Sequence, residues 1–106
     1  MQKMDILQVL RKYGAQGAQA LSNATPVNTG RAAASWNYEV GKEKGTYFIY
    51  WTNSDTENGF PVVIMLQFGH GTRNGGYVQG RDFINPAIRP IFDQIAEDVW
   101  KVVTSA

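Results

Sequence analysis

The stretch INPAIRPIFDQIAEDVWKVV, residues 84–103, predicts the clearest element of this chain. Its apolar residues recur at intervals of four, three, four, four and three: Ile84, Ile88, Ile91, Ile95, Val99 and Val102. That period places them along one side of an α-helix. Asn85 is a favourable N-cap, and Pro86 suits the first helical position. A helix from Pro86 to Val103 is about 27 Å long, enough to cross a small sheet.

A second amphipathic helix is predicted near the start of the chain, from Met4 to about Leu21. The residues of its inner face recur at intervals of four, three, four and four: Ile6, Leu10, Tyr13, Gly17 and Leu21. The second half of this segment consists largely of Gly and Ala. Small residues let another helix or a sheet approach closely, but they also weaken a helix, and both interpretations stay open.

Two strands are predicted between the helices. In residues 35–40 the apolar side chains of Trp36, Tyr38 and Val40 alternate with polar ones, which is typical of a half-buried strand. The polar, glycine-bounded residues 41–45 predict a turn into a second strand, 46–52. Both faces of this second strand carry large apolar side chains, so we expect a neighbouring subunit to cover one of them. Alternatively, tyrosine hydroxyls make one face compatible with water.

Residues 53–59 are predicted to be a polar loop, and residues 60–68 fit either a strand or a short helix. Residues 69–80 contain five glycines and predict a long mobile loop. Helices at both ends of a small antiparallel sheet indicate an α+β fold, with both helices packed on the sheet. We expect one domain spanning residues 1–106.

Composition excludes several classes of site. The chain has 106 residues, no Cys and one His, so thiolate metal sites, iron–sulfur clusters, cysteine nucleophiles and two-histidine metal sites are ruled out. Asp93, Glu97 and Asp98 are expected to face solvent, with Lys101 pairing to Glu97. No constellation indicates catalysis, so we expect no enzyme activity, no metal and no cofactor. The start of the chain does not read as a secretory signal, and the longest strongly apolar run, 60–66, is far shorter than the roughly 20 residues that cross a bilayer. We therefore expect a soluble protein.

The glycine-rich segment suggests phosphate binding, but GHGTRNGG, residues 69–76, lacks the Lys-Ser/Thr ending of a P-loop. Arg73 and Arg81 flank Tyr77, and arginines around an aromatic ring can track a nucleic-acid backbone while a base stacks on the ring. The net charge of +1 is low for a dedicated nucleic-acid binder. A small nucleic-acid binding module that uses residues 69–81 is nevertheless the alternative function.

Three segments, in this order, resemble the neck or tail-completion proteins of long-tailed bacteriophages. Thr25-Pro26-Val27-Asn28-Thr29-Gly30-Arg31, followed by Ala34-Ser35-Trp36, is similar to the family's Thr-Pro-Val-Asp-Thr-Gly-Arg segment before the first strand. Gln67-Phe68-Gly69-His70-Gly71-Thr72 resembles its Glu-Phe-Gly-Thr segment. Phe83-Ile84-Asn85-Pro86-Ala87-Ile88 resembles the segment that opens the last helix, with Phe83 as an anchor beneath it.

The chain departs from the family pattern at several positions. Asn28 and Gln67 stand where the family has acids, so a contact between that acid and a base across the subunit is not expected here. His70-Gly71 interrupts the Gly-Thr pair, and Asp82 stands where the family often has Pro.

The resemblance implies a virion structural protein that is made in the host cytoplasm. It would form a homo-oligomeric ring, with a hexamer favoured, between the head-closure connector and the tail terminator or tail tube. DNA would pass through the lumen without sequence-specific binding. The expected subunit interface comprises Arg31, Trp36, Tyr47, Ile49, Trp51, Phe60 and Phe68. The expected lumen or docking loop carries His70, Arg73, Asn74, Tyr77 and Arg81.

Overall fold

The computed structural model of the chain describes residues 5–26, 30–71 and 75–105; the side chains of Phe60 and His70 are outside this description. Four helices and six strands follow in the order α1 (Ile6–Ala24), α2 (Arg31–Ala34), β1 (Trp36–Glu43), β2 (Thr46–Asn53), β3 (Thr56–Glu57), β4 (Phe60–Pro61), α3 (Val62–Phe68), β5 (Gly69–Gly71), β6 (Tyr77–Gln79) and α4 (Ile84–Thr104). The predicted α+β class, with a small antiparallel sheet and a helix near each end of the chain, is confirmed.

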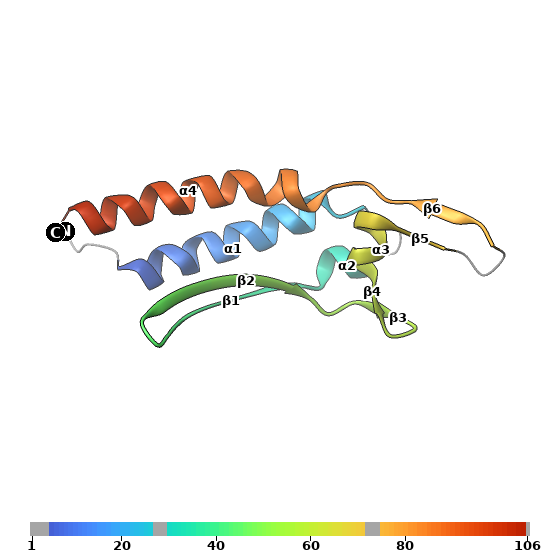
Figure 1. The fold of residues 1–106 in the computed structure, drawn as a ribbon, viewed down its shortest axis with the longest axis horizontal. Coiled ribbons are helices and arrows are strands. Elements are labelled where there is room, and N and C mark those ends of the chain that lie inside the picture. Colours follow the sequence, from blue (N-terminus) through green and yellow to red (C-terminus); the bar gives the residue numbers. More distant parts are fainter. Residues whose placement is uncertain (1–4, 27–29, 72–74, 106) are drawn as a thin grey trace.

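Helix α1 is the middle layer of the molecule, between α4 on one side and the β1–β2 hairpin on the other (Figure 1). The inner faces of α1 and α4 form the main core, which includes Val9, Tyr13, Leu21, Ile88 and Ile91. The apolar stripe predicted for the C-terminal helix therefore packs mainly on α1. Phe92, the residue after Ile91 of this stripe, contacts Trp51 of β2 in a T-shaped arrangement, with ring centres 5.7 Å apart.

The small residues of α1 form its face toward the hairpin. Gly14 lies directly under the ring of Tyr38, and Gly17 lies under the ring of Trp51. A Cβ atom built on Gly17 would be 2.5 Å from Cζ2 of Trp51, closer than real Cβ contacts. The helix is continuous through these glycines, so close approach is the interpretation that the structure favours.

The first hairpin is longer than predicted. Strand β1 continues to Glu43, where it pairs with Thr46, so the turn consists only of Lys44 and Gly45. Their φ angles of 50° and 81° are both positive, as in the two-residue turns that match the twist of antiparallel strands. The predicted five-residue turn, 41–45, was wrong because glycine at position 41 lies within the strand.

Residues 53–59 are not simply a loop. Strands β3 and β4 pair across Asn58 and Gly59, whose φ angles are 51° and 82°. Asn-Gly is a strong hairpin signal, and here it joins two very short strands. After Pro61 the chain forms α3, so most of the ambiguous segment 60–68 is helical.

The glycine-rich segment forms a third hairpin in its described part. Gly69 pairs with Gln79, and Gly71 pairs with Tyr77. This β5–β6 hairpin, which we call the β-arm (residues 69–71 and 75–79), extends from α3 away from the helices (Figure 1). The molecule measures 60 × 24 × 20 Å with a radius of gyration of 16.8 Å. A compact domain of this length has a radius of gyration of about 13 Å, so the fold is elongated.

The start of α4 differs from the prediction. The helix begins at Ile84 and its N-cap is Phe83, so Asn85 and Pro86 each lie two positions further inside the helix than expected. The side chain of Phe83 cannot cap the helix, because a phenyl ring has no hydrogen-bond acceptor; the ring is instead buried as an anchor. Another residue must therefore satisfy the first backbone N–H groups of α4.

Candidate functional site

Gln67, at the end of α3, supplies that cap. Its Oε1 accepts hydrogen bonds from the backbone N–H groups of Phe83 (3.0 Å) and Ile84 (3.1 Å), and its Nε2 donates to Oδ1 of Asp82 (2.6 Å). The hydrogen bond from Gln67 is the main reason that the pKa of Asp82 is lowered. Asp82 in turn accepts from the backbone N–H of Asn85 at 3.2 Å. A buried amide thus fastens α3 to α4, a role that the sequence reasoning missed.

Trp36 and Trp51, two of the predicted interface residues, hold the chain's own fold together. The indole N–H of Trp36 donates to Oγ1 of buried Thr25 at 2.8 Å. The indole N–H of Trp51 donates to the carbonyl of Gly14 at 2.9 Å. Both rings also pack against the core between α1 and α4. Substituting either tryptophan would therefore disturb folding as well as any interface.

Tyr47 and Ile49 share the face of β2 that includes Trp51. Tyr47 is exposed and has the ammonium group of Lys42 4.9 Å from its ring centre, whereas Ile49 is half-buried. On the opposite face Phe48 and Tyr50 stack, with ring centres 5.8 Å apart. Helix α1 covers only the first of these faces (Figure 1).

The outer face of the hairpin also carries a hydrogen bond. The hydroxyl of Tyr50 donates to Oε2 of Glu39 on β1. This hydrogen bond is the main reason that the pKa of the Tyr50 hydroxyl is raised. The outer face therefore combines two stacked rings with a polar pair at its rim.

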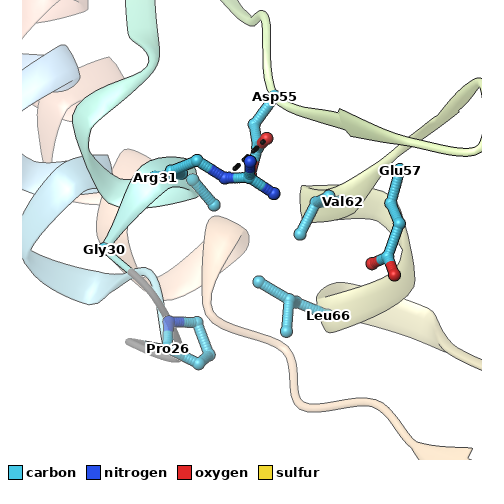
Figure 2. A pocket seen from close by; sticks show the side chains of 8 residues that line it. Pro26, Gly30, Arg31, Asp55, Glu57, Val62 and Leu66 are labelled. Carbon is cyan, nitrogen blue, oxygen red and sulfur yellow. Dashed lines mark ion pairs between the residues drawn. The ribbon is translucent and has the colours of Figure 1, made fainter.

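Arg31 lies in a small pocket of about 70 Å³ between α2, β3 and α3 (Figure 2). Its Nε is 3.8 Å from Oδ1 of Asp55, whose side chain is largely buried, and Glu57 lines the same pocket. Val62 and Leu66 form the apolar wall. The described partner of this arginine is therefore a carboxylate of its own chain.

Two neighbouring acidic residues on α4, Glu97 and Asp98, have different partners. Lys101 and Glu97 form the predicted surface pair, with Nζ and Oε1 3.5 Å apart. Asp98, expected to face solvent, instead accepts a 2.6 Å hydrogen bond from the hydroxyl of buried Tyr13. That bond is the main cause of the raised pKa of Tyr13. The prediction for Asp98 was wrong because this position lies at the edge of the α1–α4 contact.

The β-arm is fixed at its base and exposed beyond it. The backbone N–H of Arg81 donates to the carbonyl of Leu66 at 3.0 Å, and the Tyr77 hydroxyl donates to the carbonyl of Phe68 at 2.7 Å. The Phe68 side chain and the Tyr77 ring are both exposed. The structure thus places Phe68, Tyr77 and Arg81 near one another, although they were predicted for two different surfaces.

Several predicted positions fall outside the described residues. These are the segment 27–29 of the first resembling motif, Arg73 and Asn74 of the predicted lumen loop, and the side chains of Phe60 and His70.

An apolar groove of about 510 Å³ opens between β2, α3 and the start of α4. We call it the β2 groove; it is lined by Leu21, Trp36, Tyr50, Trp51, Thr52, Asn53, Pro61, Val63, Ile64, Ile84 and Ile88. None of these residues is charged. The sequence analysis did not predict this groove, because its lining residues come from six separate elements: α1, β1, β2, β4, α3 and α4.

Among residues 5–26, 30–71 and 75–105, no group of three or more His, Cys, Asp or Glu side chains is arranged to hold a metal ion. No helix in the described part of the chain has the length and apolar character needed to span a bilayer. Comparison with protein-family models, with curated proteins and with solved structures finds no match to the chain.

Proposed function

We propose that this chain is a structural subunit of the neck of a tailed bacteriophage. In this proposal, copies of the chain form a ring between the head connector and the tail tube of the virion, and DNA leaves through the lumen. The ring is a passive conduit, so the chain needs surfaces that fit its neighbours and needs no reactive groups.

The observation that carries the proposal is that the three resembling segments contact one another in the fold. Gln67 of the second segment accepts hydrogen bonds from the backbone N–H groups of Phe83 and Ile84, which open the third. Trp36, which closes the first resembling stretch, packs in the same core cluster as buried Phe83. Segments far apart in the sequence thus build one structural unit, which supports reading them as parts of a single pattern.

The chemistry of these segments supports a structural role for them. Thr25 donates to the carbonyl of Leu21 at 2.6 Å and accepts from Trp36, so it joins the end of α1 to the start of the sheet. Gly30 adopts a φ of 85° directly before Arg31, a conformation that favours glycine. Gln67, which stands where the family has an acid, is committed to the cap of α4.

The elongated shape and the uncovered apolar surfaces support assembly. The β-arm, the β2 groove and the outer face of the hairpin all present large apolar side chains to solvent in a single copy. Contiguous exposed apolar surface is typical of protein–protein contact. In a ring, each arginine of a nearly neutral chain is repeated around one channel, which gives the DNA path its positive charge.

The decisive experiment is deletion of the gene in the phage or prophage that encodes the chain. We expect DNA-filled heads and separate tails in electron micrographs of the lysate, and restored particles when the wild-type gene is supplied in trans. Mass spectrometry of purified wild-type virions should detect the chain. Normal, infectious particles without the gene product would refute the proposal.

A salt titration separates this function from the alternative nucleic-acid module. A neck subunit should bind duplex or single-stranded DNA barely at all as a free protein. A module that uses Arg81 and Tyr77 should bind DNA at low salt and lose affinity steeply as salt rises. Tight, salt-sensitive binding by the monomer would favour the alternative.

A further inference from the structure

In its described residues, the β-arm is held at its base but packs on little else of the chain. Its strands contact mainly each other and the adjacent helix α3. Val78 and Tyr77 are 47% and 66% exposed. An isolated two-stranded hairpin is at best marginally stable in water, and three or more strands or a packed face are needed for stability. A further packed surface would therefore stabilise the arm.

The β2 groove has the shape of a site for an extended chain. Four consecutive residues of β2, Tyr50–Asn53, line it although their side chains alternate between the two faces of the sheet. The groove therefore follows the edge of the strand. The sheet has two strands, so in the described part of the chain β2 has no strand partner on this edge. An open strand edge beside an apolar wall binds an added strand through its backbone groups and takes alternate side chains into the groove.

The two surfaces match in chemistry. The described residues 75–79 of the arm, Gly-Gly-Tyr-Val-Gln, are uncharged, and so is every residue that lines the groove. Contact between them buries no unpaired charge, which would be costly. Ile64, which is 47% exposed on the α3 wall of the groove, offers an apolar counterpart for Val78.

The arm of one copy does not occupy its own groove. Its base is held by the hydrogen bond from Arg81 to Leu66, and the arm leads away from the helices and from β2 (Figure 1). We infer that the β2 groove of one copy receives the β-arm of a second copy, which adds a strand to the open edge of β2. This inference rests on the proposed function, for which it names the contact between neighbouring subunits.

The contact is heterologous, since two different surfaces of the same chain meet. Each copy then offers one free arm and one free groove. Such a contact closes into a ring when the rotation between copies permits and otherwise extends into a filament.

The test uses three matched substitutions at exposed apolar positions. Val78→Asp alters the arm and Ile64→Asp alters the groove. Val103→Asp is the control, because Val103 is also an exposed valine (56%) but lies near the far end of α4. Circular dichroism and urea unfolding should show that all three variants fold. Sedimentation velocity over a range of concentrations should show that Val78→Asp and Ile64→Asp each weaken self-association at least tenfold, while Val103→Asp changes it less than twofold.

Mixing the two defective variants gives a sharper readout. A Val78→Asp copy keeps an intact groove, and an Ile64→Asp copy keeps an intact arm. An equimolar mixture should therefore form a 1:1 dimer that does not grow further. Wild-type association by either variant alone, or a mixture that stays monomeric, overturns the inference, as does a wild-type chain that is monomeric at every concentration.

The outcomes also separate this inference from the proposed function. Suppose that the gene deletion gives the phenotype of a neck protein, but both variants still assemble and restore particles to the deletion strain. The neck function is then supported and the arm–groove contact is refuted. If the mixture forms the 1:1 dimer but deletion of the gene leaves the particles normal, the arm–groove contact is supported and the neck function is refuted.

Discussion

Replacing Gln67 by alanine removes the acceptor for two backbone N–H groups at the start of α4. Those of Phe83 and Ile84 both donate to Oε1, at 3.0 and 3.1 Å, and the Gln67 side chain is buried. A buried donor left without a partner costs about 1–3 kcal/mol. Water can reach the backbone N–H of Ile84 more easily than that of Phe83, because the hydrogen bond of Ile84 is only partly buried. We therefore expect Gln67→Ala to lower the free energy of unfolding by about 2–4 kcal/mol.

Urea unfolding followed by tryptophan fluorescence measures this loss, since the chain has three Trp residues. Gln19→Ala is the matched control: Gln19 is exposed on α1, and its side-chain amide donates to Oδ1 of Asn23 at 3.0 Å. That variant should change the free energy of unfolding by less than about 0.5 kcal/mol. If Gln67→Ala is no more destabilising than the control, the capping argument is wrong.

The conservative change Gln67→Glu carries a pH signature. In the wild type, the hydrogen bond from Gln67 lowers the pKa of Asp82, so it stabilises the fold above the ordinary pKa of Asp and is lost as the pH falls. In the variant, two carboxyl groups face each other and the pair binds a proton more tightly when folded. The variant should therefore be most stable near pH 4 and lose stability toward pH 7, while the wild type does the opposite. This reasoning would be contradicted if the urea midpoints of the wild type and the variant differed by the same amount at both pH values.

Two further predictions concern helix α1. Gly17→Ala gains about 1 kcal/mol in helix propensity but places a Cβ 2.5 Å from the ring of Trp51. Because overpacking of this kind costs about 1–3 kcal/mol, we expect urea unfolding to show a net loss of stability of about 1 kcal/mol. A net gain would show that the ring can move aside. Tyr13→Phe removes the 2.6 Å bond to Asp98 and should cost about 1–2 kcal/mol at pH 7. Because the pKa of Tyr13 is raised in the folded state, the wild type loses this advantage as the pH rises above about 10. The unfolding curves of the two proteins should therefore converge at high pH. A difference in stability that persists there would refute the role given to the Tyr13–Asp98 hydrogen bond.

Periodicity predicted most of the architecture because helices and strands impose their own intervals on the sequence. The apolar stripe of α4 and the alternation in β1 are local patterns, and both elements are present, although α4 begins earlier and β1 ends later than expected. The turn at Asn58–Gly59 was also visible in the sequence, but its flanking strands of two residues each are too short to alternate. The boundaries of the hairpins were therefore less predictable than the helices.

The candidate site was less predictable, because it depends on which elements meet. The apolar face that includes Trp51 indicates that something covers it, but periodicity does not say whether a neighbour or the chain's own helix does so. Here Gly14 and Gly17 of α1 receive the hairpin rings. Likewise, the capping role of Gln67 depends on a partner 16 residues away, and nothing in the spacing of the two segments specifies that contact.

The bonds at the base of the β-arm have a consequence for how the chain tolerates change in length. Gln67 and Asp82 are 15 residues apart in sequence, yet their side chains are joined at 2.6 Å, and the bond from Arg81 to Leu66 lies beside them. The arm is thus a closed loop whose two ends are fixed independently of what lies between them. Lengthening such a loop costs little, since even doubling its length adds only about 0.6 kcal/mol of closure entropy. Insertions or deletions in the arm can therefore alter its reach while α1, α4 and the sheet keep their packing.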